Sequence, residues 1–71
     1  MVFPKYPDVK VKFTNKNGNA FNLIGLVRIA LKKGGVRSEE ITQFSNEATS
    51  GDYDNVLQTC MKWVTITWIK Q

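Results

Sequence analysis

The chain has 71 residues, ten Lys and Arg against six Asp and Glu, a net charge of +4 and no histidine. Its length predicts one small domain, residues 1–71, with a thin core. The lack of histidine removes the commonest general base and the commonest metal ligand, which argues against most enzyme classes. The positive charge favours either a solvated surface or binding to an acidic partner, to nucleic acid or to an anionic membrane surface.

A single cysteine cannot form an internal disulfide, and a small domain without such staples predicts a reducing, cytoplasmic setting. No apolar stretch approaches the ~20 residues that span a bilayer, so we expect no membrane segment. The N-terminal residues lack the apolar run of a signal peptide. Residues 1–7 hold both prolines and predict an extended lead-in.

Alternation of apolar and polar residues predicts a half-buried strand over residues 8–14, with lysines on its outer face. Residues 15–18 are expected to form a turn, and Asn19 to cap the helix that follows. Apolar residues at helical spacing predict this first helix, and its main apolar stripe is expected to consist of Phe21, Ile24, Val27, Ala30 and Leu31. Two lysines and Gly34 should end the helix.

The predicted first helix is apolar around most of its circumference. Leu23, Leu26 and Ile29 lie outside its main apolar stripe, and they belong either to the core or to a protein contact. Gly25 lies in the middle of the same helix, where it costs about 1 kcal/mol relative to alanine. We expect the close approach of another element to explain this glycine.

A second helix should follow, with Ser38 as its cap. Its narrow apolar stripe is predicted to consist of Ile41, Phe44 and Ala48. The polar run 49–51 breaks this pattern, and Asp52 should cap a third helix. The buried face of the third helix is predicted to consist of Tyr53, Val56, Leu57, Cys60, Met61 and Val64. From about Trp63 the period changes to two, which predicts a closing strand.

The predicted fold is therefore α+β, in the order strand, three helices, strand (βαααβ). Because a lone strand leaves its backbone groups unpaired, the two strands should pair with each other, with the helices packed on one face. We expect this pairing to bring both termini to the same side. An isolated two-stranded sheet is marginal, so the helices should supply most of the stability.

The residues that could carry chemistry are better explained by structure. Cys60 falls in an apolar stripe and should pack in the core rather than act as a nucleophile. Asp52 and Asp54, with Glu47 nearby, suit helix capping better than metal binding. The glycines match neither a dinucleotide-binding fingerprint nor a P-loop. We therefore expect no catalytic residue, no metal site and no cofactor.

Two surfaces are candidates for binding. Basic residues could contact a phosphate backbone weakly: Lys10, Lys12, Lys16, Arg28, Lys32, Lys33 and Arg37. The acidic residues that begin the second and third helices argue against a helix-turn-helix reader of DNA. The second candidate is a protein contact or self-association, made by Leu23, Leu26 and Ile29 or by the loop around Ser50 and Tyr53.

Much of the chain resembles a family of small uncharacterised proteins from bacteria, cyanobacteria included, and from phage and mobile elements. The residues that carry the resemblance are Gly18–Phe21, Gly25, Val27, Ala30–Leu31, Gly35–Val36, Glu40–Ile41, Phe44, Glu47–Asp54, Leu57, Met61 and Trp63–Val64. The resemblance implies no site residue, because that family has no assigned activity. Its phage association favours a regulatory or interaction role.

These observations together predict a small non-enzymatic module for protein interaction or regulation. The alternative is weak, salt-sensitive binding of nucleic acid through the basic residues. No small-molecule substrate is evident.

Overall fold

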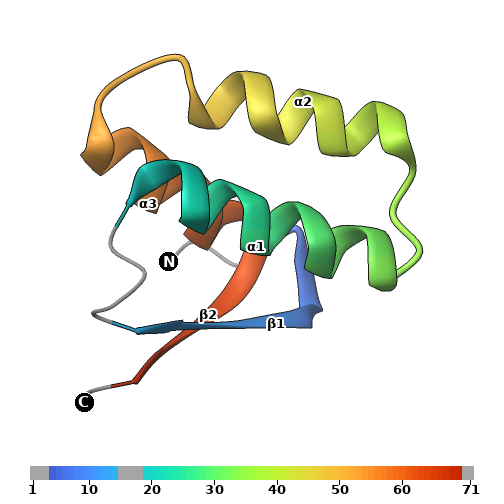
Figure 1. Cartoon of the computed structure of the whole chain (residues 1–71). Coiled ribbons are helices and arrows are strands. Elements are labelled where there is room, and N and C mark those ends of the chain that lie inside the picture. The colour runs from blue at the N-terminus through green and yellow to red at the C-terminus, as the bar shows by residue number, and fades with distance from the viewer. Residues whose placement is uncertain (1–3, 15–18, 70–71) are drawn as a thin grey trace.

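The computed structural model describes residues 4–14 and 19–69, which form five elements in the predicted order (Figure 1). The elements are β1 (Tyr6–Thr14), α1 (Ala20–Lys33), α2 (Ser38–Ala48), α3 (Tyr53–Trp63) and β2 (Val64–Ile69). The α+β prediction of strand, three helices and strand is therefore confirmed. The predicted turn at 15–18, and Lys16 within it, lie outside the described residues.

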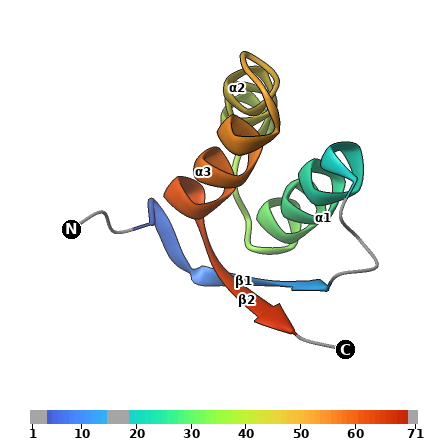
Figure 2. The ribbon, with the colours of Figure 1, turned by 90° about the vertical axis from the view of Figure 1, so that its left-hand side faces the viewer.

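The two strands pair in parallel, with Val11 opposite Ile66 and Phe13 opposite Trp68. The expectation that both termini lie on the same side is therefore wrong. Parallel strands run in one direction, so the described chain enters at one end of the pair and leaves at the other (Figure 2). The three helices form the crossover connection that a parallel pairing requires.

The predicted extended lead-in is partly strand. Tyr6 already pairs with Val64, and the Thr65 hydroxyl donates a 2.8 Å hydrogen bond to the carbonyl of Pro7. The register shifts between Tyr6 and Lys10, where Pro7 supplies no amide hydrogen to the ladder. β1 therefore begins two residues before the predicted start, because pairing with β2 continues past the proline.

All three helices lie over the same face of the sheet (Figure 2). α1 packs against β1, α3 packs against β2, and α2 lies on α1 and α3 on their side away from the sheet. The core between these layers consists of Val11, Phe13, Leu23, Ile24, Val27, Leu31, Ile41, Phe44, Ala48, Val56, Cys60, Trp63 and Val64. Lys10 and Lys12 are exposed and alternate with the buried Val11 and Phe13, so they lie on the opposite, outer face of the sheet.

Two of the three predicted helix caps are confirmed. The Phe21 amide donates to Asn19 Oδ1 at 2.9 Å, and the Asn55 amide donates to Asp52 Oδ1 at 3.0 Å. The prediction for Ser38 is wrong, because Ser38 is the first helical residue and Arg37 occupies the cap position without a side-chain hydrogen bond. The Arg37 carbonyl accepts the first bonds of α2.

The end of α1 explains this shift. Gly34 is the C-cap, as expected, but the left-handed conformation falls on Gly35, whose φ is +85°. The Gly35 amide donates to the carbonyl of Lys32, and the Val36 amide donates to that of Leu31, which completes a Schellman motif. Because Val36 is still bonded to α1, the chain becomes helical again only at Ser38.

The predicted buried face is right for α2 and only partly right for α3. The α2 stripe is confirmed. The buried residues of α3 are Val56, Thr59, Cys60 and Trp63, whose spacing places them on one side of a helix. Tyr53 and Met61 are exposed, so their predicted burial is wrong. Hydropathy alone missed Thr59, which is buried because it lies one turn before Trp63 on the packed side.

Candidate protein-interaction surface

The three extra apolar residues of α1 lie in three different environments. Leu23 is 1% exposed and belongs to the core, so it is corrected from a candidate contact to a structural residue. Leu26 is half-buried at the edge of the core. Ile29 is 58% exposed, and Phe21, which sequence analysis did not select, is 78% exposed. Phe21 escaped selection because its helical spacing assigned it to the main apolar stripe.

Gly25 lies between these two exposed side chains, one helical turn from each. A Cβ atom added at Gly25 would have no neighbour within 4 Å. The expectation that another element approaches this glycine closely is therefore wrong, since the glycine faces open space. Because the glycine has no side chain, the surface of α1 is depressed between Phe21 and Ile29.

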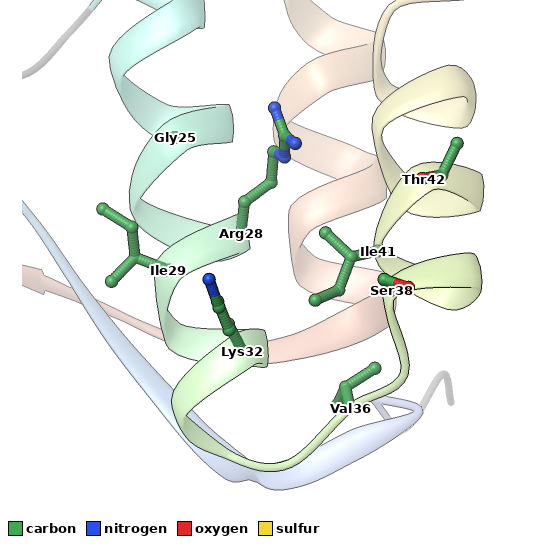
Figure 3. A pocket seen from close by; sticks show the side chains of 8 residues that line it. All are labelled: Gly25, Arg28, Ile29, Lys32, Val36, Ser38, Ile41 and Thr42. Carbon is green, nitrogen blue, oxygen red and sulfur yellow. The ribbon is translucent and has the colours of Figure 1, made fainter.

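A hollow of about 610 Å³ lies between α1 and α2 (Figure 3). Its lining residues are Gly25, Arg28, Ile29, Lys32, Val36, Ser38, Ile41 and Thr42. Arg28 and Lys32 extend from α1, and Ile41 extends from α2 toward the space between the helices (Figure 3). The lining therefore combines two cations with apolar side chains and hydroxyls, and it includes no acidic residue.

A smaller hollow of about 330 Å³ continues along the outer side of α1. It is lined by Phe21, Asn22, Gly25, Leu26 and Ile29. The two hollows share Gly25 and Ile29, so they form one surface that runs along the helix. We call this the α1 surface and define it as Phe21, Asn22, Gly25, Leu26, Arg28, Ile29 and Lys32.

The predicted basic residues do not gather into one cradle. Arg28 and Lys32 line the same hollow, whereas the exposed Lys33 and Arg37 do not line it. Lys10 and Lys12 lie on the outer face of the sheet, away from the helices. The structure therefore places Arg28 and Lys32 on one face of the molecule and Lys10 and Lys12 on another.

In the polar loop between α2 and α3, side chains form hydrogen bonds with the end of α2. The Ser50 hydroxyl donates to the carbonyl of Glu47 at 2.7 Å. Asn55 Nδ2 donates to the same carbonyl at 2.9 Å and to that of Ala48 at 3.3 Å. These bonds satisfy carbonyls at the end of α2, which is a structural role. No local sequence pattern reveals this role of Asn55, because its partners lie seven and eight residues away.

The other candidate of this loop, Tyr53, is 43% exposed. It lines a third hollow of about 240 Å³ together with Phe21 and Asp52. This hollow places the start of α3 beside the Phe21 end of the α1 surface. Tyr53 therefore adjoins the α1 surface without belonging to it.

A second polar cluster joins the start of the chain to the helices. Lys5 Nζ forms an ion pair with Glu40 at 2.8 Å and lies 4.6 Å from the centre of the Trp63 ring. Hydrogen bonds from Lys5 and then from Tyr6 lower the pKa of Glu40 below its usual value. The hydrogen bond between Lys5 and Glu40 also raises the pKa of Lys5. These groups tie residues 5 and 6 to the helices, and no local sequence pattern reveals them.

The remaining reactive group is the Cys60 thiol. It is fully buried in the core, and this burial raises its pKa to about 11. The thiol is therefore neutral at physiological pH and unsuited to nucleophilic attack. The prediction that Cys60 packs in the core is confirmed.

Within residues 4–14 and 19–69, no three His, Cys, Asp or Glu side chains lie close enough together to hold a metal ion. None of the helices in the same ranges has the length and hydrophobicity that crossing a bilayer requires.

Comparisons with protein-family models, with curated proteins and with solved structures returned no match. The family resemblance given above therefore stays a prediction.

Proposed function

We propose that this protein is a non-enzymatic protein-interaction module whose α1 surface contacts the partner. One observation carries the proposal: Gly25 faces open space between Phe21 and Ile29, which are exposed by 78% and 58%. Exposed apolar side chains that lie together on one helix are typical of a contact surface.

The energetic balance supports this proposal. A glycine inside a helix costs about 1 kcal/mol relative to alanine, and no packing contact within the described chain offsets that cost. Complete burial of a Phe or Ile side chain is worth about 1.5–3 kcal/mol. A partner that covers Phe21 and Ile29 would therefore recover more free energy than the glycine costs.

The alternative, nucleic-acid binding, has less support. Phosphate binding gains from several cations along one path, whereas Arg28 and Lys32 are separated from Lys10 and Lys12 by the helices and the sheet. Arg28 and Lys32 also lie beside Ile29 and Ile41, an environment that suits an amphipathic partner better than a phosphate backbone.

Photo-crosslinking tests the interaction role. A photoreactive phenylalanine analogue is placed at position 29 and, as the matched control, at exposed Gln58 on the outer side of α3. We expect a discrete protein adduct from position 29 in the native host cell and none from position 58. Equal adducts from both positions, or none from position 29, would contradict the proposal.

A further inference from the structure

We propose that the partner segment of the α1 surface is an acidic amphipathic helix, whose carboxylates lie at Arg28 and Lys32 and whose apolar side chains lie at Phe21, Leu26 and Ile29. This inference rests on the interaction role proposed above and adds the chemistry of the partner.

The charges of the α1 surface support an acidic partner. α1 contains three basic residues and no acidic residue, and the hollow between α1 and α2 has no acidic lining. Among residues 4–14 and 19–69, the ion pair within 4.0 Å is that of Lys5 with Glu40, so Arg28 and Lys32 have no carboxylate partner there. A carboxylate brought to them completes a pair without breaking an existing one.

The dimensions of the α1 surface suit a short helix. From Phe21 to Lys32 the surface covers three turns of α1, about 16 Å at the usual helical rise. A partner helix of similar length presents apolar side chains at i, i+3 or i+4, and i+7 along one face. Gly25 lies near the middle of this length and lets the partner backbone approach closely.

The two ends of the surface differ in charge, which orients the partner. Arg28 and Lys32 lie toward the C-terminal end of α1. At the other end, Phe21 shares a hollow with Asp52. We therefore expect the carboxylates of the partner to gather at the Arg28 end, while its apolar face follows Phe21, Leu26 and Ile29 along the helix.

A second copy of this chain fits the surface poorly. A parallel pair of α1 helices would bring Arg28 and Lys32 of both copies together, and an antiparallel pair would offer these four cations only Asp52 of each copy, because α1 contains no acidic residue. Like charges placed in one contact oppose association. The surface therefore favours a different, acidic chain over self-association.

A displayed library of random peptides of about 12 residues, the length that covers three to four helical turns, is selected against the whole protein. We expect the selected peptides to be rich in Asp and Glu, with apolar residues at helical spacing. Their amide shift perturbations should map to the α1 surface. Selected peptides without acidic bias, or the absence of any enrichment, would overturn the acidic-helix proposal.

Charge-reversal variants identify the cations that matter. R28E/K32E should weaken the selected peptides by at least about tenfold, since two ion pairs are replaced by repulsion. The matched control K10E/K12E changes the net charge equally on the outer face of the sheet and should bind nearly as tightly as the unmodified protein. Equal losses from both variants would show that net charge alone is responsible, which overturns the proposal. R28Q/K32Q is a milder variant in case reversal prevents folding.

The same variants separate the other possible outcomes. An oligonucleotide that binds through Arg28 and Lys32 while no peptide does would overturn the proposal in favour of nucleic acid. A crosslinked partner at position 29, together with selected peptides that lack acidic residues, would leave the interaction role standing and reject the acidic helix alone.

Discussion

The indole nitrogen of Trp63 donates a 2.7 Å hydrogen bond to Oε2 of Glu47, and this bond joins the last residue of α3 to the last turn of α2. Trp63 is 4% exposed. It packs edge-on against Phe44 and stacks with Tyr6 of β1. Because β2 begins at the next residue, this junction positions the closing strand relative to both helices.

Replacing Glu47 tests this junction. We expect Glu47→Ala to lower the free energy of unfolding by about 1–2 kcal/mol, since it leaves a partly buried indole N–H without its charged acceptor. Glu47→Gln keeps an oxygen acceptor and should cost less. Urea unfolding followed by Trp63 fluorescence, in a Trp68→Phe background, measures both variants. Unchanged stability of Glu47→Ala would contradict the prediction.

A substitution at Gly25 should stabilise the protein. Gly25→Ala should raise the free energy of unfolding by about 0.5–1 kcal/mol, because helix propensity improves and the added Cβ meets no atom within 4 Å. Chemical denaturation measures the gain. A loss of stability would indicate a packing role for the glycine that the structure lacks.

The same substitution at Gly51 should lower the free energy of unfolding. A Cβ atom at position 51 would lie 2.9 Å from the Cβ of Asn55, which cannot move without shifting α3. We expect Gly51→Ala to destabilise the protein by about 1–3 kcal/mol, the usual cost of overpacking. Comparing its thermal unfolding with that of Gly25→Ala makes each variant the control for the other. A neutral Gly51→Ala would show that the loop relaxes freely.

Acid should weaken the contact of Glu40 with Lys5 and Tyr6. Their hydrogen bonds hold the Glu40 pKa below its ordinary value of 4.5, so the contact contributes stability above that pH and loses it as the pH falls through the lowered pKa. We expect the difference in urea midpoint between the unmodified protein and Glu40→Gln to shrink over that window. A difference that stays constant in acid would assign the effect of the variant to something other than this charge.

Alkali should act through Cys60. The thiol pKa is raised from 9.0 to about 11, so burial of the neutral thiol contributes stability below pH 9 and loses it as the pH rises toward 11. A Cys60→Ala variant should therefore show a shallower alkaline decline in stability. At neutral pH a thiol reagent should modify Cys60 only when the chain unfolds. Rapid modification of the folded protein would contradict its burial.

The features that could be predicted from the sequence depend on interactions between residues close together in the chain. Caps at Asn19 and Asp52 depend on an amide two or three residues away, and the α2 stripe depends on a repeat within eleven residues. Both signals lie inside one element, so they were readable before any packing was known. The order of five elements follows from the same signals. For the candidate site, helical spacing placed Ile29 outside the main stripe, and the structure leaves its side chain exposed.

Contacts between distant residues required the tertiary structure. Helical spacing does not distinguish the core residue Leu23 from the exposed Ile29, because both lie off the main stripe and only the placement of β1 and α2 decides which is covered. The same applies to the open space at Gly25.

The sequence by itself determined the type and order of the helices and strands and most of their extents, because backbone hydrogen bonds, caps and side-chain periodicity act over a few residues. The tertiary structure alone decided that β1 and β2 run in parallel, that Lys5 meets Glu40, and that Arg28 and Lys32 share a hollow with α2. These relationships join segments far apart in the chain, and the packing of whole elements selects them because no local preference extends that far.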